Sequence, residues 1–324
     1  MTEATLAPAP TRVPDDVETP RERIAYLAYR GLERVATALP ERAGRAAFTG
    51  LAAAAFRLAP GVRAVVAGNL AQVLGRPADS PLVQAATREA FTLYARYWHE
   101  TFLARAFPPK EVNRRFRMVD REHIDRALEA GRGCIVALPH MGNWDVAGQF
   151  MAVNGYRLVS VAEELRPRRL AELFLRHREA LGMEIIVLKD SKTVGLQLSG
   201  LLARNSVVAL VADRDLGGKG VDVEMFGAIR KLPPGPALLA LSTGAALLSA
   251  AVWTEDDGWL CRIGPPLRIQ RTASLRDDVA TLTRMLGADF ERAIAARPVD
   301  WHMFQPAWPK DRDRPQERSL LAPE

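Results

Sequence analysis

The side chains best suited to acid–base chemistry stand at the end of a short apolar segment. Residues 133–145 bring a lone histidine, His140, to a turn, and Asp145 follows five positions later. Along one regular helix, five residues turn through about 500°, so the two side chains would point roughly 140° apart. If His140 lies on the turn and Asp145 in the first turn of the next helix, the carboxylate can fold back onto the imidazole, or it can cap the N-terminal end of that helix, and the two roles do not exclude each other. A carboxylate folded back onto the imidazole fixes the tautomer and raises the basicity of a general base.

A second carboxylate follows another uncharged segment. Asp213 comes directly after residues 207–212, which have the composition of a buried strand. Because the carboxyl ends of parallel strands meet at one edge of an open α/β sheet, we expect Asp213 to lie near His140. Its short side chain leaves open whether it contacts the imidazole directly or through a bridging water.

His302 is the other histidine that could compete for a catalytic role. It is flanked by Trp301, Phe304 and Trp308, a composition that favours a packed C-terminal segment closing the core or a groove. The His, Cys, Asp and Glu residues show no spacing typical of zinc ligands, so we expect no metal site.

After about residue 130, strand-like and helix-like segments that could position these groups alternate along the chain. Strand-like runs occur at 134–138, 158–162, 185–188, 207–212 and 247–253, and helix-like runs at 144–154, 166–181, 193–203, 235–243 and 275–296. The alternation predicts an α/β fold with a mostly parallel central sheet flanked by helices. Helical patterns at 21–58 and 82–104 predict an N-terminal helical layer.

We expect one domain at 21–312, with the helical layer at 21–128 and the α/β core at 129–312. A disordered leader at 1–20, which lacks the apolar region of a signal peptide, and a flexible tail at 313–324 would flank it. The uncharged stretch 232–254 is long enough to cross a bilayer. Its Pro and Gly residues favour a turn, a buried helix and a strand instead.

Composition restricts the kind of partner. A chain of 324 residues with 48% hydrophobic content can bury a large core, and its net charge of +6 favours anionic partners such as acidic phospholipids or a coenzyme A phosphate. No nucleic-acid-binding module accompanies the charge, so nucleic acid is not expected. Two cysteines, Cys134 and Cys261, fit a reducing cytosol and structural packing.

The first helical segment is amphipathic and basic. Arg23, Arg30 and Arg34 lie off an apolar stripe formed by Ile24, Leu27, Ala28, Leu32, Val35, Ala36 and Leu39. Such a helix either packs on the core or lies flat on an anionic membrane, and both interpretations stay open.

Four segments, in one order along the chain, carry a family resemblance. They are residues 140–145, with the pattern His-x-x-x-x-Asp, then 161–163, 211–216 with 220–227, and 300–308. Together they cover roughly residues 20 to 310. They resemble the actinobacterial phosphatidylinositol mannoside acyltransferases, a branch of the glycerolipid and lipid A acyltransferases.

The resemblance implies a peripheral protein on the cytoplasmic side of the cell membrane that acylates a mannose hydroxyl of phosphatidylinositol mannoside. Acyl-CoA would be a substrate, and no cofactor is implied. His140 would be the general base, with Asp145 and Asp213 holding and compensating the imidazolium. Glu163 and Arg178 match active-site supports of this branch.

Two further groups are expected near the reacting carbonyl: the side chain of Asn143 and the backbone of Gly142 could donate hydrogen bonds there. The chain departs from the branch at Asp213, where the branch has glutamate, and at Glu164, where it has arginine. Two alternatives stay open, an acyltransferase for another glycolipid or lysophospholipid and a catalytically silent lipid-binding protein. Oligomeric state and acyl-chain length are not fixed by the sequence.

Overall fold

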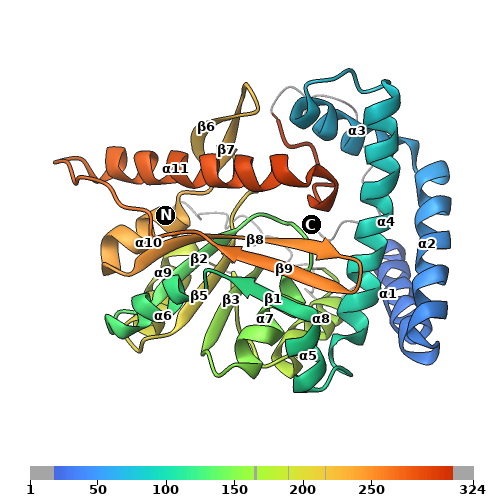
Figure 1. Cartoon of the computed structure of the whole chain (residues 1–324), viewed down its shortest axis with the longest axis horizontal. Helices are drawn as coiled ribbons and strands as arrows, with labels where there is room; N and C mark the ends of the chain where they lie inside the picture. Colours follow the sequence, from blue (N-terminus) through green and yellow to red (C-terminus); the bar gives the residue numbers. More distant parts are fainter. Residues whose placement is uncertain (1–17, 164–165, 189, 216, 309–324) are drawn as a thin grey trace, which may run out of the picture.

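The computed structural model describes residues 18–163, 166–188, 190–215 and 217–308. In this part of the chain, helices cover both faces of a seven-stranded sheet, and helices α1 to α4 gather at one end of it (Figure 1). The predicted α/β class with a mostly parallel sheet and an N-terminal helical layer is confirmed. The predicted tail at 313–324, and the predicted leader apart from residues 18–20, lie outside the described residues.

The main sheet has the strand order β1-β9-β8-β2-β5-β3-β4. Strands β8, β2, β5, β3 and β4 run parallel to one another, whereas β9 is antiparallel to β8 and β1 is parallel to β9. The strands are β1 (Phe116–Val119), β2 (Cys134–Leu138), β3 (Leu158–Glu163), β4 (Glu184–Leu188), β5 (Val207–Val211), β8 (Ala246–Glu255) and β9 (Gly258–Ile263), and a separate hairpin contains β6 (Val221–Met225) and β7 (Ala228–Leu232).

The side chains of β2 divide the core into two layers. Ile135 and Ala137 join a cluster with α9, α10, α11 and the β6–β7 hairpin, whereas Cys134, Val136 and Leu138 join one with α5, α6 and α7. This alternation is the period of an extended strand, and all five side chains are buried because helices cover both faces. The helices are α5 (Pro109–Arg115), α6 (Glu122–Glu129), α7 (Trp144–Val153), α8 (Arg168–Ala180), α9 (Ser191–Leu202), α10 (Gly235–Thr243) and α11 (Leu275–Ala296).

The N-terminal layer contains α1 (Pro20–Ala38), α2 (Glu41–Leu58), α3 (Pro60–Leu74) and α4 (Pro81–Ala104). Thr19 caps α1: its hydroxyl accepts the N–H of Glu22, whose carboxylate accepts the N–H of Thr19 in return. No single helix in the described residues is long and apolar enough to cross a membrane, and the α2–α3 pair that reaches this length bends by 95°. The segment 232–254 contains α10 and most of β8.

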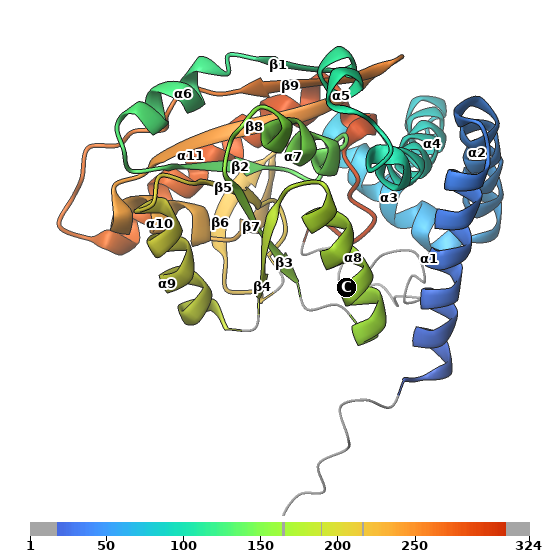
Figure 2. The same cartoon turned by 90° about the horizontal axis from the view of Figure 1, so that it is seen from below.

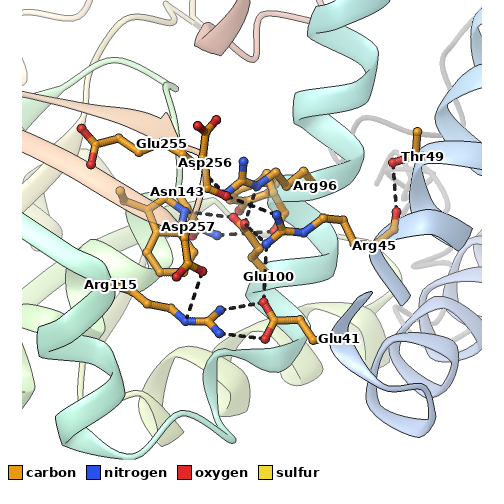
Figure 3. A network of polar contacts seen from close by, with 12 residues as sticks. Glu41, Arg45, Thr49, Arg96, Glu100, Arg115, Asn143, Glu255, Asp256 and Asp257 are labelled. Atoms are coloured by element: carbon orange, nitrogen blue, oxygen red, sulfur yellow. Dashed lines mark hydrogen bonds and ion pairs between the residues drawn. The ribbon is translucent and has the colours of Figure 1, made fainter. Parts of the chain in front are cut away.

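A buried ionic network joins the helical layer to the sheet (Figure 3). Glu100 of α4 is 3% exposed, and its carboxylate accepts hydrogen bonds from Arg96 Nε at 2.5 Å and from Trp259 Nε1 at 2.9 Å. Arg96 Nη2 also donates to the carbonyl of Glu255, at the turn between β8 and β9. Removing one partner of such a buried pair typically costs about 3–5 kcal/mol, so this network fixes α4 against the sheet.

Candidate active site

The register of β2 and β5 brings the two predicted catalytic groups together. Leu138 pairs with Val211 at the carboxyl ends of these parallel strands. The second residue after the end of β2 is His140, and the second residue after the end of β5 is Asp213. The Nδ1 atom of His140 lies 2.5 Å from Oδ1 of Asp213, so the aspartate contacts the imidazole directly despite its short side chain.

Asp213 is fully buried, and the protein satisfies both of its carboxylate oxygens. Its Oδ2 accepts the indole N–H of Trp301 at 2.8 Å, and its backbone carbonyl accepts Nη2 of Arg230. Burial alone raises the pKa of Asp213, but the charge and hydrogen bond of His140, with the nearby Arg230 charge and the Trp301 hydrogen bond, hold this pKa well below its usual range. Asp213 is therefore a carboxylate at neutral pH.

The ionised Asp213 sets the tautomer of His140. A carboxylate can only accept, so Nδ1 of His140 carries a proton, and whenever the ring is neutral its lone pair is on Nε2. The His140 side chain is 19% exposed and lines the large groove at this edge of the sheet. The ring of Trp144 packs edge-on against the imidazole, with centroids 5.4 Å apart. This arrangement suits a general base directed at a bound ligand.

Asp145 lies in the first turn of the helix after β2, as predicted, but its carboxylate is bonded elsewhere and does not contact His140. Asp145 is the second residue of α7 and is 2% exposed; one oxygen accepts the hydroxyl of Tyr97 and the other accepts Nε of Arg178, each at 2.7 Å. Burial alone raises the pKa of Asp145, but the Arg178 charge and these hydrogen bonds hold it below its usual range. Asp145 thus ties α7 to α4 and α8.

The two expected donors, Gly142 and Asn143, already have partners within the fold. The N–H of Gly142 donates to the carbonyl of Asp300, and the Asn143 side chain caps α7 and reaches the carbonyl of Tyr97. Gly142 has a φ of 59°, and a Cβ there would lie 2.3 Å from the carbonyl of Val252. In the described structure these residues shape the turn after β2.

Glu163 and Arg214 face each other at the same edge of the sheet. Glu163 ends β3, the neighbour of β5, and Arg214 directly follows Asp213. Their charged atoms are 4.0 Å apart, and both residues line the groove. Nε of Arg214 is buried without a hydrogen-bond partner among the described residues. The sequence resemblance included Arg214 in a motif but gave it no role.

The groove over His140 has a volume of about 2150 Å³. Helices α8 and α9 lie on opposite sides of β3 and β4 (Figure 2). The α9–α10 side of the groove is mainly apolar and includes Val194, Leu196, Leu198, Leu238 and Leu239. The α8 side carries four arginines, Arg166, Arg168, Arg169 and Arg178. Sites of 300–1,000 Å³ hold a drug-sized ligand, so this groove is large enough for longer molecules.

His302 packs under the site as part of the C-terminal segment. Its backbone N–H donates to the carbonyl of His140, and its Nε2 lies 3.1 Å from the carbonyl of Gly142. Burial lowers the pKa of His302 to about 3, so the ring is a weak base. Asn69 of α3 fixes the segment, donating to the carbonyls of Met303 and Gln305.

Cys134 and Cys261 are buried, and burial raises the pKa of each thiol to about 12, which leaves them unreactive at neutral pH. Within the described ranges, no group of three or more His, Cys, Asp or Glu side chains could hold a metal ion.

Three comparisons relate this chain to known proteins. Residues 14–310 match the family described as bacterial lipid A biosynthesis acyltransferase. A phosphatidylinositol mannoside acyltransferase of Mycolicibacterium smegmatis is 38% identical over 291 residues, covering 89% of this chain and 93% of the relative. One from Mycobacterium tuberculosis is 40% identical over 252 residues, covering 75% and 76%. The 1-acyl-sn-glycerophosphate acyltransferase PlsC of Thermotoga maritima aligns with a TM-score of 0.35 and 13% identity, over 75% of this chain and 96% of that one.

Proposed function

Because this chain belongs to the bacterial lipid A biosynthesis acyltransferase family, we propose that it moves a long-chain fatty acyl group from acyl-CoA to a mannose hydroxyl of phosphatidylinositol mannoside. The acceptor follows from the two mycobacterial relatives, whose names specify it. The observation that carries the chemistry is the His140–Asp213 pair, whose imidazole lines a groove of about 2150 Å³.

His140 starts the reaction as the general base. Its Nε2 takes the proton of the acceptor hydroxyl, and that oxygen attacks the carbonyl carbon of the thioester. When the tetrahedral intermediate collapses, the ester C–O bond remains and the C–S bond breaks. The imidazolium returns the proton to the leaving sulfur, so the products are the acylated mannoside and free coenzyme A. Asp213 stabilises the imidazolium between these two transfers.

Negative charge develops on the thioester oxygen during the attack, and a donor must lie in the groove to receive it. The N–H of Gly142 and the Asn143 amide are bonded elsewhere. Arg214 lines the groove beside Asp213, and its Nη1 atom is 4.0 Å from the carboxylate of Glu163, its nearest anion among the described residues. We assign this guanidinium to the oxyanion.

The outer face of α1 is suited to an anionic membrane surface at the cytoplasmic side. Ile24 and Leu27 are 58% and 57% exposed, and Val35 also faces solvent. The exposed residues Arg23 and Arg34 flank this strip. An apolar strip edged by arginines is the pattern of a helix that lies in the interface of an anionic bilayer. The protein would thus meet its lipid acceptor as a peripheral protein.

Two alternatives use the same groove. An acyltransferase for another glycolipid or a lysophospholipid needs the same base and donor, and a silent lipid-binding protein needs neither. Incubation of the purified protein with labelled palmitoyl-CoA and separate acceptors distinguishes them. We expect labelled product with phosphatidylinositol mannoside and much less with lysophosphatidic acid. Preference for the lysophospholipid would support the first alternative, and lipid binding without any transfer would support the second.

A further inference from the structure

Arg230 is a fully buried cation directly behind the catalytic edge of the sheet. It lies on β7, opposite Val223 of β6, and is 2% exposed. Burying a guanidinium is costly, and hydrophobic residues of similar volume often stabilise a core equally well. Its contacts therefore indicate what this residue does.

These contacts reach Asp213 by two routes. Nη2 of Arg230 donates to the backbone carbonyl of Asp213 at 2.5 Å. The guanidinium also lies over the ring of Trp301, 5.3 Å from its centroid, and the indole N–H of Trp301 donates to Oδ2 of Asp213. The same guanidinium lies 5.5 Å from the ring centroid of Trp308, and the two indole rings are themselves neighbours, with centroids 5.9 Å apart. One side chain thus contacts both the main chain of Asp213 and the residue that orients its carboxylate.

We propose that Arg230 is a positioning residue for acyl transfer, which holds Asp213 and Trp301 so that the carboxylate fixes the imidazole of His140. This inference rests on the proposed function, because it requires that His140, held by Asp213, acts as the general base. It also gives the β6–β7 hairpin a role outside the main sheet. Catalytic geometry tolerates displacements of only about 0.5 Å, so a shift in either contact is expected to slow the chemical step.

The test compares Arg230→Met, which keeps volume without charge or donors, with Arg230→Lys, which keeps the charge and one donor. We expect Arg230→Met to lower kcat at least about tenfold while KM for acyl-CoA changes less than about threefold. Arg230→Lys should give an intermediate kcat, because an ammonium cannot bond the carbonyl and cover both rings at once.

Arg63→Met is the matched control. Nη1 of Arg63 donates to the carbonyl of Phe56, and its guanidinium lies 5.2 Å from the ring centroid of Phe56, in the helical layer. The Arg63→Met substitution removes a carbonyl hydrogen bond and a ring contact of the same kind, but in the helical layer and not beside the His140–Asp213 pair. We therefore expect kcat to stay within about twofold of wild type.

A readout without substrate separates this proposal from the proposed function. The Nδ1 proton shared by His140 and Asp213 should give a downfield proton resonance that is absent in His140→Ala, displaced in Arg230→Met and retained in Arg63→Met. Wild-type kcat with an unchanged resonance in Arg230→Met would overturn the positioning role. If that variant does not fold, a folded Arg230→Lys with wild-type kcat overturns it. A wild-type protein without transfer activity overturns the proposed function, while the resonance still decides the role of Arg230.

Discussion

The Nδ1 atom of His140 lies 2.5 Å from Oδ1 of Asp213, although 73 positions separate the two residues in the chain. The contact exists because β2 and β5 are parallel neighbours in register and each is followed by a two-residue step to its polar side chain. Trp301 and Arg230 then hold Asp213 from behind. Position and ionisation of the carboxylate are thus set by the fold before a ligand arrives.

Replacing Asp213 separates charge from geometry. Asp213→Asn keeps the size but removes the negative partner of the imidazolium, so we expect turnover to fall at least about tenfold. Asp213→Glu keeps the charge but adds a methylene to a fully buried site whose two oxygens are bonded, so its loss should be measurable and smaller than that of Asn. Steady-state rates with labelled acyl-CoA measure both. Equal activity of Asp213→Asn and wild type would remove this residue from the mechanism.

Replacing Arg214 tests whether its guanidinium stabilises the oxyanion. We expect Arg214→Gln to lower kcat by about tenfold or more, because the charge is needed most in the transition state. Arg168→Gln is the control: Arg168 also lines the groove, but its side chain is 80% exposed and pairs with Glu172. A loss confined to KM in Arg214→Gln would assign this cation to ground-state binding instead.

His302 predicts a pH dependence of stability. Its pKa is about 3 in the folded protein and near 6.5 when unfolded, so between these values only the unfolded chain binds the proton. The free energy of unfolding therefore falls as the pH falls below about 6.5, by about 2 kcal/mol between pH 7 and pH 5 from this group alone.

His302→Gln keeps a donor for the carbonyl of Gly142 and does not titrate. Its melting temperature should therefore drop less than that of wild type between pH 7 and pH 5, with turnover retained. An identical drop in both proteins would show that His302 does not carry this dependence.

Membrane association should depend on the outer face of α1. The exposed residues Arg23 and Arg34 are expected to matter more than Arg30, whose guanidinium is paired with Glu33 at 2.5 Å. Joint replacement of Arg23 and Arg34 by Gln should weaken cosedimentation with anionic vesicles, and salt should weaken that of wild type, because exposed charges are screened over roughly 8 Å at physiological ionic strength.

The control for the membrane experiment replaces Arg276 and Arg284, two exposed arginines of α11, by Gln. This double variant removes the same charge from a helix away from α1 (Figure 1). Equal binding of both double variants would mean that net charge, rather than α1, controls association.

The sequence predicted the elements whose patterns are local. The strand at 134–138 and the helices at 235–243 and 275–296 have the predicted bounds, since apolar runs and flanking Gly, Pro or Ser residues mark them. β1, β9 and the β6–β7 hairpin are absent from the predicted strands. β1 is four residues long and carries Arg117 in its middle, and only its pairing with β9 identifies it as a strand.

The site was predictable to the extent that strand ends determine it. His140 and Asp213 came together because both follow buried parallel strands. Asp145 lies in the first turn of α7, as predicted, but its carboxylate does not reach His140, because its orientation depends on Tyr97 and Arg178, which lie 48 and 33 positions away and are brought close only by tertiary packing. The apolar residues Ile24 and Leu27 fit the predicted stripe, but the structure leaves them exposed, which the helical period alone could not decide.

The central claim is that His140 acts as the base in acyl transfer. The most direct measurement is the rate at which His140→Ala transfers labelled palmitate from palmitoyl-CoA to phosphatidylinositol mannoside, beside wild type and with folding checked by circular dichroism. We predict a loss of at least about a hundredfold, the usual lower range for a general base, in a protein with an unchanged spectrum. Wild-type turnover by a folded His140→Ala protein would contradict the account.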